Sequence, residues 1–115
     1  MSIVRHESHG ILSKAVEGGG FVFTAGITPN DYSKDVTGQT REVLAEIDRV
    51  LGLAGSDKSK ILSATIWVPD IRLRDGVNVA WNEWTGGENL PARACIEARL
   101  ASTDILVEIA VVALK

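Results

Sequence analysis

A chain of 115 residues, 45% hydrophobic and 23% charged, has the size and composition of one globular domain. Its net charge of −3 does not favour nucleic-acid binding, and no run of residues is typical of a membrane span or a signal peptide. The single cysteine excludes an internal disulfide, and no histidine–cysteine cluster has metal-binding spacing. We therefore expect one cytoplasmic, metal-free domain over residues 1–115.

The N-terminal third predicts β-structure. Residues 3–7 are compatible with a short edge strand. Residues 10–16 and the β-branched and aromatic residues 21–25 flank a run of three glycines at 18–20, which is a strong turn signal. This arrangement predicts a β-hairpin, followed by a polar loop from Thr28.

Two amphipathic helices are predicted next, one from about residue 36 and one from Asp70, which can act as its N-cap. Gly55 lies where a left-handed C-terminal residue is expected, and residues 85–87 end the second helix. Between the helices, residues 61–68 predict a strand that stops at Pro69. The apolar stripes are Val43, Leu44, Ile47, Val50, Leu51 and Ala54 in the first helix, and Leu73, Val77, Ala80, Trp81 and Trp84 in the second.

The C-terminal residues predict two further strands. Residues 93–99 alternate between polar and apolar positions, whereas residues 105–114 are apolar on both faces except at Glu108. If residues 101–104 form a hairpin loop, Leu100 pairs with Ile105, and Cys95 faces Ala110. The same register places Arg93 opposite Val112, and Glu97 opposite Glu108. Opposed residues share a face, so we expect Arg93, Cys95 and Glu108 to project together.

Each of these three side chains has a functional and a structural interpretation. Arg93 is either a bidentate carboxylate ligand or a surface arginine paired with a glutamate. Cys95 either positions a water or is an inert small hydrophobe. Glu108 is either a general acid–base, its pKa raised by desolvation, or a structurally paired carboxylate.

The predicted order of elements is β-β-β-α-β-α-β-β, which indicates an α+β fold with two helices packed on one face of a mixed sheet. No helix remains for the other face, although the last strand is apolar on both sides. An uncovered apolar sheet face predicts self-association.

The sequence resembles the Rid family, also called RidA/YjgF or L-PSP, from about Val16 to the C-terminus. The most specific motifs are Pro91-Ala-Arg93-Ala-Cys95-Ile-Glu97 and Leu106-Val-Glu108-Ile. Supporting matches are Phe23-Thr-Ala-Gly26, Leu44-Ala-Glu-Ile-Asp48, Thr65-Ile-Trp-Val-Pro-Asp70 and Val77-Asn78-Val-Ala-Trp81. The short length and the segment 80–84 are most similar to the YoaB-like subgroup.

The resemblance implies a chorismate-mutase-like fold, a homotrimer with clefts between subunits, and hydrolysis of 2-imino or 2-enamino acids to 2-keto acids and ammonia without a cofactor. It implies that Arg93 holds the substrate carboxylate, that Glu108 and Cys95 place the attacking water, and that the backbone at Gly26 contributes to the pocket. No membrane partner is implied, and nucleic acid is disfavoured by charge.

Two departures from the family pattern bear on activity. Leu12 stands where many members carry a tyrosine, and Ala25 stands where they carry a serine. A trimer that binds small carboxylic acids without turnover is therefore the alternative function. Ribonuclease activity or translation inhibition, which the family name also suggests, is disfavoured by the acidic composition.

Overall fold

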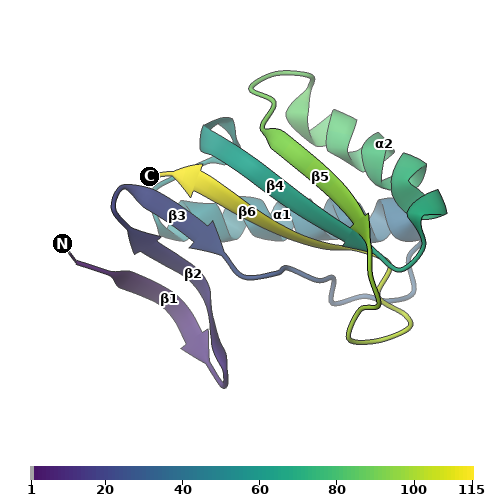
Figure 1. Cartoon of the computed structure of the whole chain (residues 1–115), viewed down its shortest axis with the longest axis horizontal. Helices are drawn as coiled ribbons and strands as arrows, with labels where there is room; N and C mark the ends of the chain where they lie inside the picture. Colours follow the sequence, from purple (N-terminus) through teal and green to yellow (C-terminus); the bar gives the residue numbers. More distant parts are fainter. Residues whose placement is uncertain (1) are drawn as a thin grey trace.

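The N-terminal third forms three antiparallel strands, as predicted. In this computed structural model, which describes residues 2–115, they are β1 (Val4–His9), β2 (Leu12–Gly18) and β3 (Phe21–Thr24). The remaining strands are β4 (Ile61–Val68), β5 (Ala92–Glu97) and β6 (Glu108–Leu114). All six belong to one mixed sheet in the order β1-β2-β3-β6-β4-β5 (Figure 1).

Both predicted helices are present, and their ends have clear local causes. Helix α1 (Val36–Leu53) begins where the Asp35 side chain accepts a hydrogen bond from the Gly38 amide, and Gly55 follows it with a φ of +73°. Asp70 caps a short 3-10 helix, Ile71–Leu73, rather than α2 itself. Helix α2 (Arg74–Thr85) follows that turn and ends at the left-handed Gly86.

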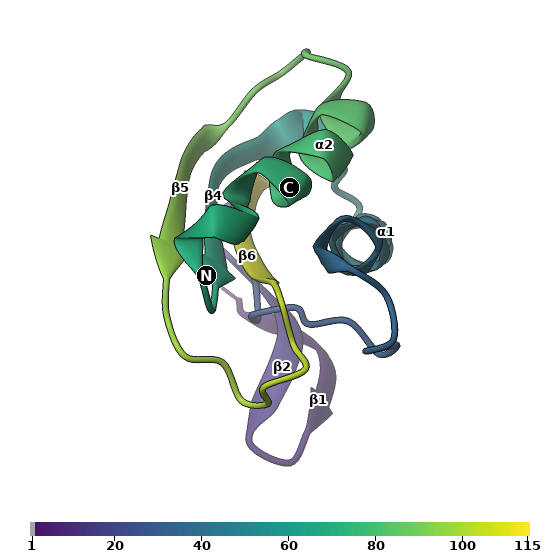
Figure 2. The same ribbon diagram turned by 90° about the vertical axis from the view of Figure 1, so that its right-hand side faces the viewer.

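The two helices pack side by side against the same face of the sheet (Figure 2). Their predicted apolar stripes form the core together with the inward residues of the central strands. Where the first turn of α2 meets the start of α1, Gly76 has no room for a side chain, because a Cβ would lie 2.5 Å from Val36 Cγ1. The other sheet face has no helix over it, as predicted, and no helix within residues 2–115 is long and apolar enough to cross a membrane.

The predicted hairpin between the last two strands is wrong. Strand β4 lies between β5 and β6, pairing parallel with β5 and antiparallel with β6. The reason is the β4-α2-β5 unit: a strand, a helix and a second strand form a crossover that places the two strands parallel and adjacent. Ten residues then separate Glu97 from Glu108 and carry the chain past β4 to its other edge.

Candidate functional site

Arg93 projects from β5 toward α2. It lies beside Ala64 of β4, which is buried in the core on the helix-covered face, so the arginine shares that face. Its Nη2 donates a 2.7 Å hydrogen bond to Asn78 Oδ1, and its Cζ lies 5.1 Å from the centre of the Trp81 ring. Among residues 2–115 no acidic side chain forms an ion pair with Arg93, so the amide and the aromatic face orient the guanidinium while its charge stays uncompensated.

Asn78 is a candidate site residue that the sequence analysis missed, and Trp81 was considered there only as a core residue. Both belong to α2 and are three residues apart, so they lie on one face of the helix. Trp81 is 5% exposed, and one side of its ring contributes to the core while the arginine lies over the ring. The sequence did contain a signal for Asn78. This asparagine borders the apolar stripe of a predicted helix, and the strand that follows the helix carries Arg93.

Cys95 lies two residues beyond Arg93 on the same face of β5 and is half-buried against the core. Burial raises the pKa of its thiol, and the positive charges of Arg93 and Arg74 only partly oppose this effect. At neutral pH the side chain is therefore a neutral thiol. A protonated thiol is a weak nucleophile, which favours a positioning role over covalent catalysis.

Glu108, the first residue of β6, contacts the backbone at Gly26 closely. A Cβ added at Gly26 would lie 2.2 Å from Glu108 Oε2 and 3.0 Å from its Cδ. The neighbouring pair Ile27 and Ile109 exchanges two backbone hydrogen bonds of 2.8 and 3.1 Å, which fixes this approach. Glycine at position 26 thus provides the space that the carboxylate occupies.

The glutamate carboxylate is half-buried, and within residues 2–115 it forms neither a hydrogen bond nor an ion pair with another side chain. Among the same residues, no group of three or more histidine, cysteine or acidic side chains is arranged to hold a metal ion. A carboxylate placed in this way is free to accept a proton or to orient a water molecule.

The expected patch of Arg93, Cys95 and Glu108 does not form within one chain. Arg93 aligns with Ala64, whereas Glu108 aligns with Trp67, three residues further along β4. Positions three apart on a strand face opposite sides. We call Arg93, Cys95, Asn78 and Trp81 the arginine half-site, on the helix-covered face. Gly26 and Glu108 form the glutamate half-site, on the uncovered face.

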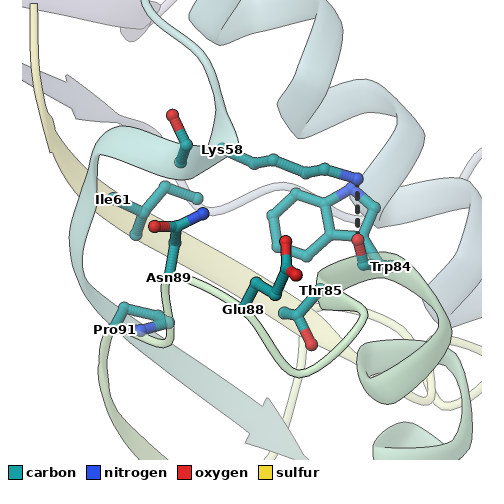
Figure 3. Close-up of a pocket in the computed structure, with 8 residues that line it drawn as sticks. Lys58, Ile61, Trp84, Thr85, Glu88, Asn89 and Pro91 are labelled. Carbon is teal, nitrogen blue, oxygen red and sulfur yellow. Dashed lines mark hydrogen bonds between the residues drawn. The ribbon is translucent and has the colours of Figure 1, made fainter.

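A separate cavity of about 110 Å³ lies at the C-terminal end of α2 and contains neither half-site (Figure 3). The Lys58 ammonium donates a 2.7 Å hydrogen bond to the Trp84 carbonyl oxygen and lies 5.4 Å from the centre of the Trp84 ring. A cation at this position satisfies a helix-terminal carbonyl. The lysine therefore has a structural role at the end of α2.

The fold and the half-sites define a two-layer α+β protein with an oriented arginine at one sheet edge and a free glutamate on the open face. Residues 3–115 match the family model described as endoribonuclease L-PSP. The chain is 35% identical over 113 residues to the RutC family protein YoaB from Escherichia coli, covering 98% of both chains. It is 45% identical over 94 residues to a RutC family protein from Haemophilus ducreyi, covering 82% of this chain and 80% of the relative.

Solved structures of related proteins have the same fold over most of the chain. A member of the YjgF protein family from Neisseria meningitidis superposes with a TM-score of 0.96 at 38% identity, covering 100% of this chain and 96% of the other. A protein of the conserved Rid family from Yersinia pestis gives a TM-score of 0.86 at 33% identity, covering 94% and 90%. The chain belongs to the L-PSP family, also named YjgF or RutC, as its motifs predict, and it has that family's chorismate-mutase-like fold.

Proposed function

We propose that the protein hydrolyses reactive 2-imino and 2-enamino acids to 2-keto acids and ammonia. The observation that carries the proposal is the oriented, uncompensated guanidinium of Arg93. Its 2.7 Å hydrogen bond to Asn78 uses one Nη2 donor, so other N–H groups of the fork remain for a substrate carboxylate. Membership of the L-PSP family, which includes Rid proteins, supports this choice of chemistry.

In the proposed reaction, Arg93 binds the carboxylate and so fixes the adjacent C=N carbon. Glu108 takes a proton from a water molecule as the water oxygen bonds to that carbon and passes it to the imine nitrogen, giving a carbinolamine. Glu108 then moves the carbinolamine hydroxyl proton to the amino nitrogen, so that the C–N bond breaks, the C=O bond forms and ammonia leaves. The reaction consumes one water per imine and requires no redox partner. Orientation supplies most of the acceleration, because imines are already electrophilic.

We propose further that the complete site lies between subunits of a homotrimer. Within one chain the arginine and glutamate half-sites are on opposite sheet faces, so a neighbouring copy must supply one of them. The glutamate half-site shares its face with the exposed side chains Phe21, Phe23 and Leu114, each 39–47% exposed. An apolar face of this kind supports contact with another subunit. A head-to-tail contact that closes into a ring repeats the same composite site at every interface.

The direct test is ammonia release from 2-iminopropionate or 2-iminobutyrate generated in situ by an amino-acid oxidase. The wild type should accelerate release over the spontaneous rate, and Arg93→Ala should lose the acceleration. Asn78→Ala should raise KM because it leaves the guanidinium less well oriented. Absence of acceleration for every side-chain size would reject the deaminase proposal.

The alternative is a trimer that binds small carboxylic acids without turnover, and the residues Leu12 and Ala25 favour it because both lack a hydroxyl group. Glu108→Gln separates the two functions. For a deaminase, this variant should lose turnover while retaining affinity for a 2-keto acid. For a simple acid-binding protein, the wild type itself should bind the keto acid without accelerating imine hydrolysis.

A further inference from the structure

A second arginine lies next to the arginine half-site. Arg74 is the first residue of α2, and Arg74, Asn78 and Trp81 occupy positions i, i+4 and i+7, which lie on one face of a helix. Asn78 and Trp81 both contact Arg93, so this face is turned toward β5. The crossover makes α2 run antiparallel to β5, as Figure 1 shows, and this brings Arg74 toward the end of β5 beyond Arg93.

Cys95 lies in that direction, two residues after Arg93. Burial raises the pKa of its thiol, and the charges of both arginines oppose this rise, which agrees with both guanidinium groups lying near the cysteine. One helical turn separates Arg74 from Asn78, about 6 Å along the helix axis. Arg93 and Cys95 are about 7 Å apart along the strand. Arg74 and Arg93 therefore place two positive charges on the facing sides of α2 and β5, near Cys95.

Arg74 is the available cation in this region. Within residues 2–115 its exposed guanidinium forms no hydrogen bond or ion pair. The neighbouring Arg72 is occupied, because its Nη2 and Nε bind the Asp70 carboxylate at 2.6 and 3.0 Å. Glu97, the nearest acidic residue of β5, accepts a 2.9 Å hydrogen bond from the Ile71 amide.

We propose that Arg93 and Arg74 together select dicarboxylic substrates, namely 2-imino acids with a four- or five-carbon chain and a second, distal carboxylate. Arg93 binds the carboxylate next to the imine carbon, and Arg74 binds the distal one. The inference rests on the proposed function for its chemistry, but it assigns to Arg74 a role in specificity that Arg93 alone does not supply. A compact monocarboxylic imino acid leaves Arg74 unused.

The experiment measures binding and turnover separately. Affinities for 2-oxoglutarate and for 2-oxobutyrate are measured by titration calorimetry for the wild type, Arg74→Gln and Arg72→Gln. The Arg72 variant is the control. It removes the same charge at a position two residues before Arg74, where the guanidinium is already paired with Asp70. The wild type should prefer the dicarboxylate. Arg74→Gln should weaken 2-oxoglutarate binding at least about fivefold and leave 2-oxobutyrate binding unchanged.

Equal affinity for the two acids, binding of neither, or equal losses in the two arginine variants would overturn the assignment. Imine hydrolysis is then assayed with the imines of glutamate and 2-aminobutyrate. A dicarboxylate preference in binding without hydrolysis of either imine would reject the deaminase while leaving the Arg74 specificity intact. Hydrolysis of both imines without a dicarboxylate preference in binding would support the deaminase and reject the role of Arg74 in specificity.

Discussion

Replacing Gly26 by alanine should impair catalysis far more than folding. The added Cβ would lie 2.2 Å from Glu108 Oε2, more than 1 Å short of the 3.4 Å at which ordinary contact begins. The obstructing atom is the far end of a flexible side chain, and Gly26 does not have a positive φ, so the backbone can accept alanine. The carboxylate must therefore move by about 1 Å.

In the proposed reaction, a displacement of that size costs about 100-fold in rate, because the Glu108 carboxylate no longer faces the attacking water. We therefore expect kcat for 2-iminobutyrate to fall about 100-fold in Gly26→Ala. The free energy of unfolding should change by less than about 1 kcal/mol, since the glutamate can rotate toward solvent.

The matched control is Gly52→Ala. Gly52 lies in α1 with open space around its Cα, and alanine should stabilise the helix there by about 0.5–1 kcal/mol without affecting turnover. Steady-state kinetics and urea unfolding of both variants separate the two effects. Full activity in Gly26→Ala would refute the reasoning, because it would show that the position of Glu108 against this backbone is not needed.

Three further predictions concern buried or half-buried side chains. Gln39→Leu should lower the free energy of unfolding by about 3 kcal/mol in urea titrations, because the fully buried amide bonds three backbone groups that leucine leaves unpaired. Alkylation of Cys95 by iodoacetamide should be slow at pH 7 and rise with pH through a pKa above the ordinary thiol value, and fast alkylation at pH 7 would contradict this. Hydrogen bonds from Lys115 and His6 lower the pKa of the Glu17 carboxyl. The ionised glutamate therefore contributes stability above pH 4.5, and this contribution is lost as the pH falls through the lowered pKa. In acid unfolding experiments, Glu17→Gln should lack this pH-dependent loss of stability.

Local pattern predicted the elements of this fold well, because each depends on neighbours in sequence. The apolar stripe of α1 is buried as expected, and Gly55 adopts the left-handed conformation assigned to it. Strand alternation also predicted that Arg93 and Cys95 share a face. These features follow from periodicity and from the conformational preferences of single residues.

The order of strands could not be read in the same way. Both β4 and β5 are compatible neighbours for β6, since alternation states which face a residue occupies but not which strand lies beside it. The hairpin assumption chose the nearer strand in sequence and so placed Glu108 with Arg93. A crossover rule applied to residues 61–97 favours the observed parallel pair.

The side-chain partners of the site were equally non-local. Asn78 approaches Arg93 only because α2 packs back along β5, and the space at Gly26 matters only because β6 begins beside it. The resemblance to the Rid family named Arg93, Cys95, Gly26 and Glu108, but it assigned no site role to Asn78 or Trp81. It did not predict that a single chain divides them between two faces of the sheet.

The measurement that tests the composite site most directly is subunit mixing. Arg93→Ala and Glu108→Gln proteins, each inactive alone, are unfolded together at equal concentration, refolded, and assayed for ammonia release from 2-iminobutyrate. A site built from Arg93 of one copy and Glu108 of its neighbour should recover about a quarter of the wild-type activity, since that fraction of random interfaces carries both intact residues. A mixture as inactive as its two components, although it forms mixed trimers, would contradict the account.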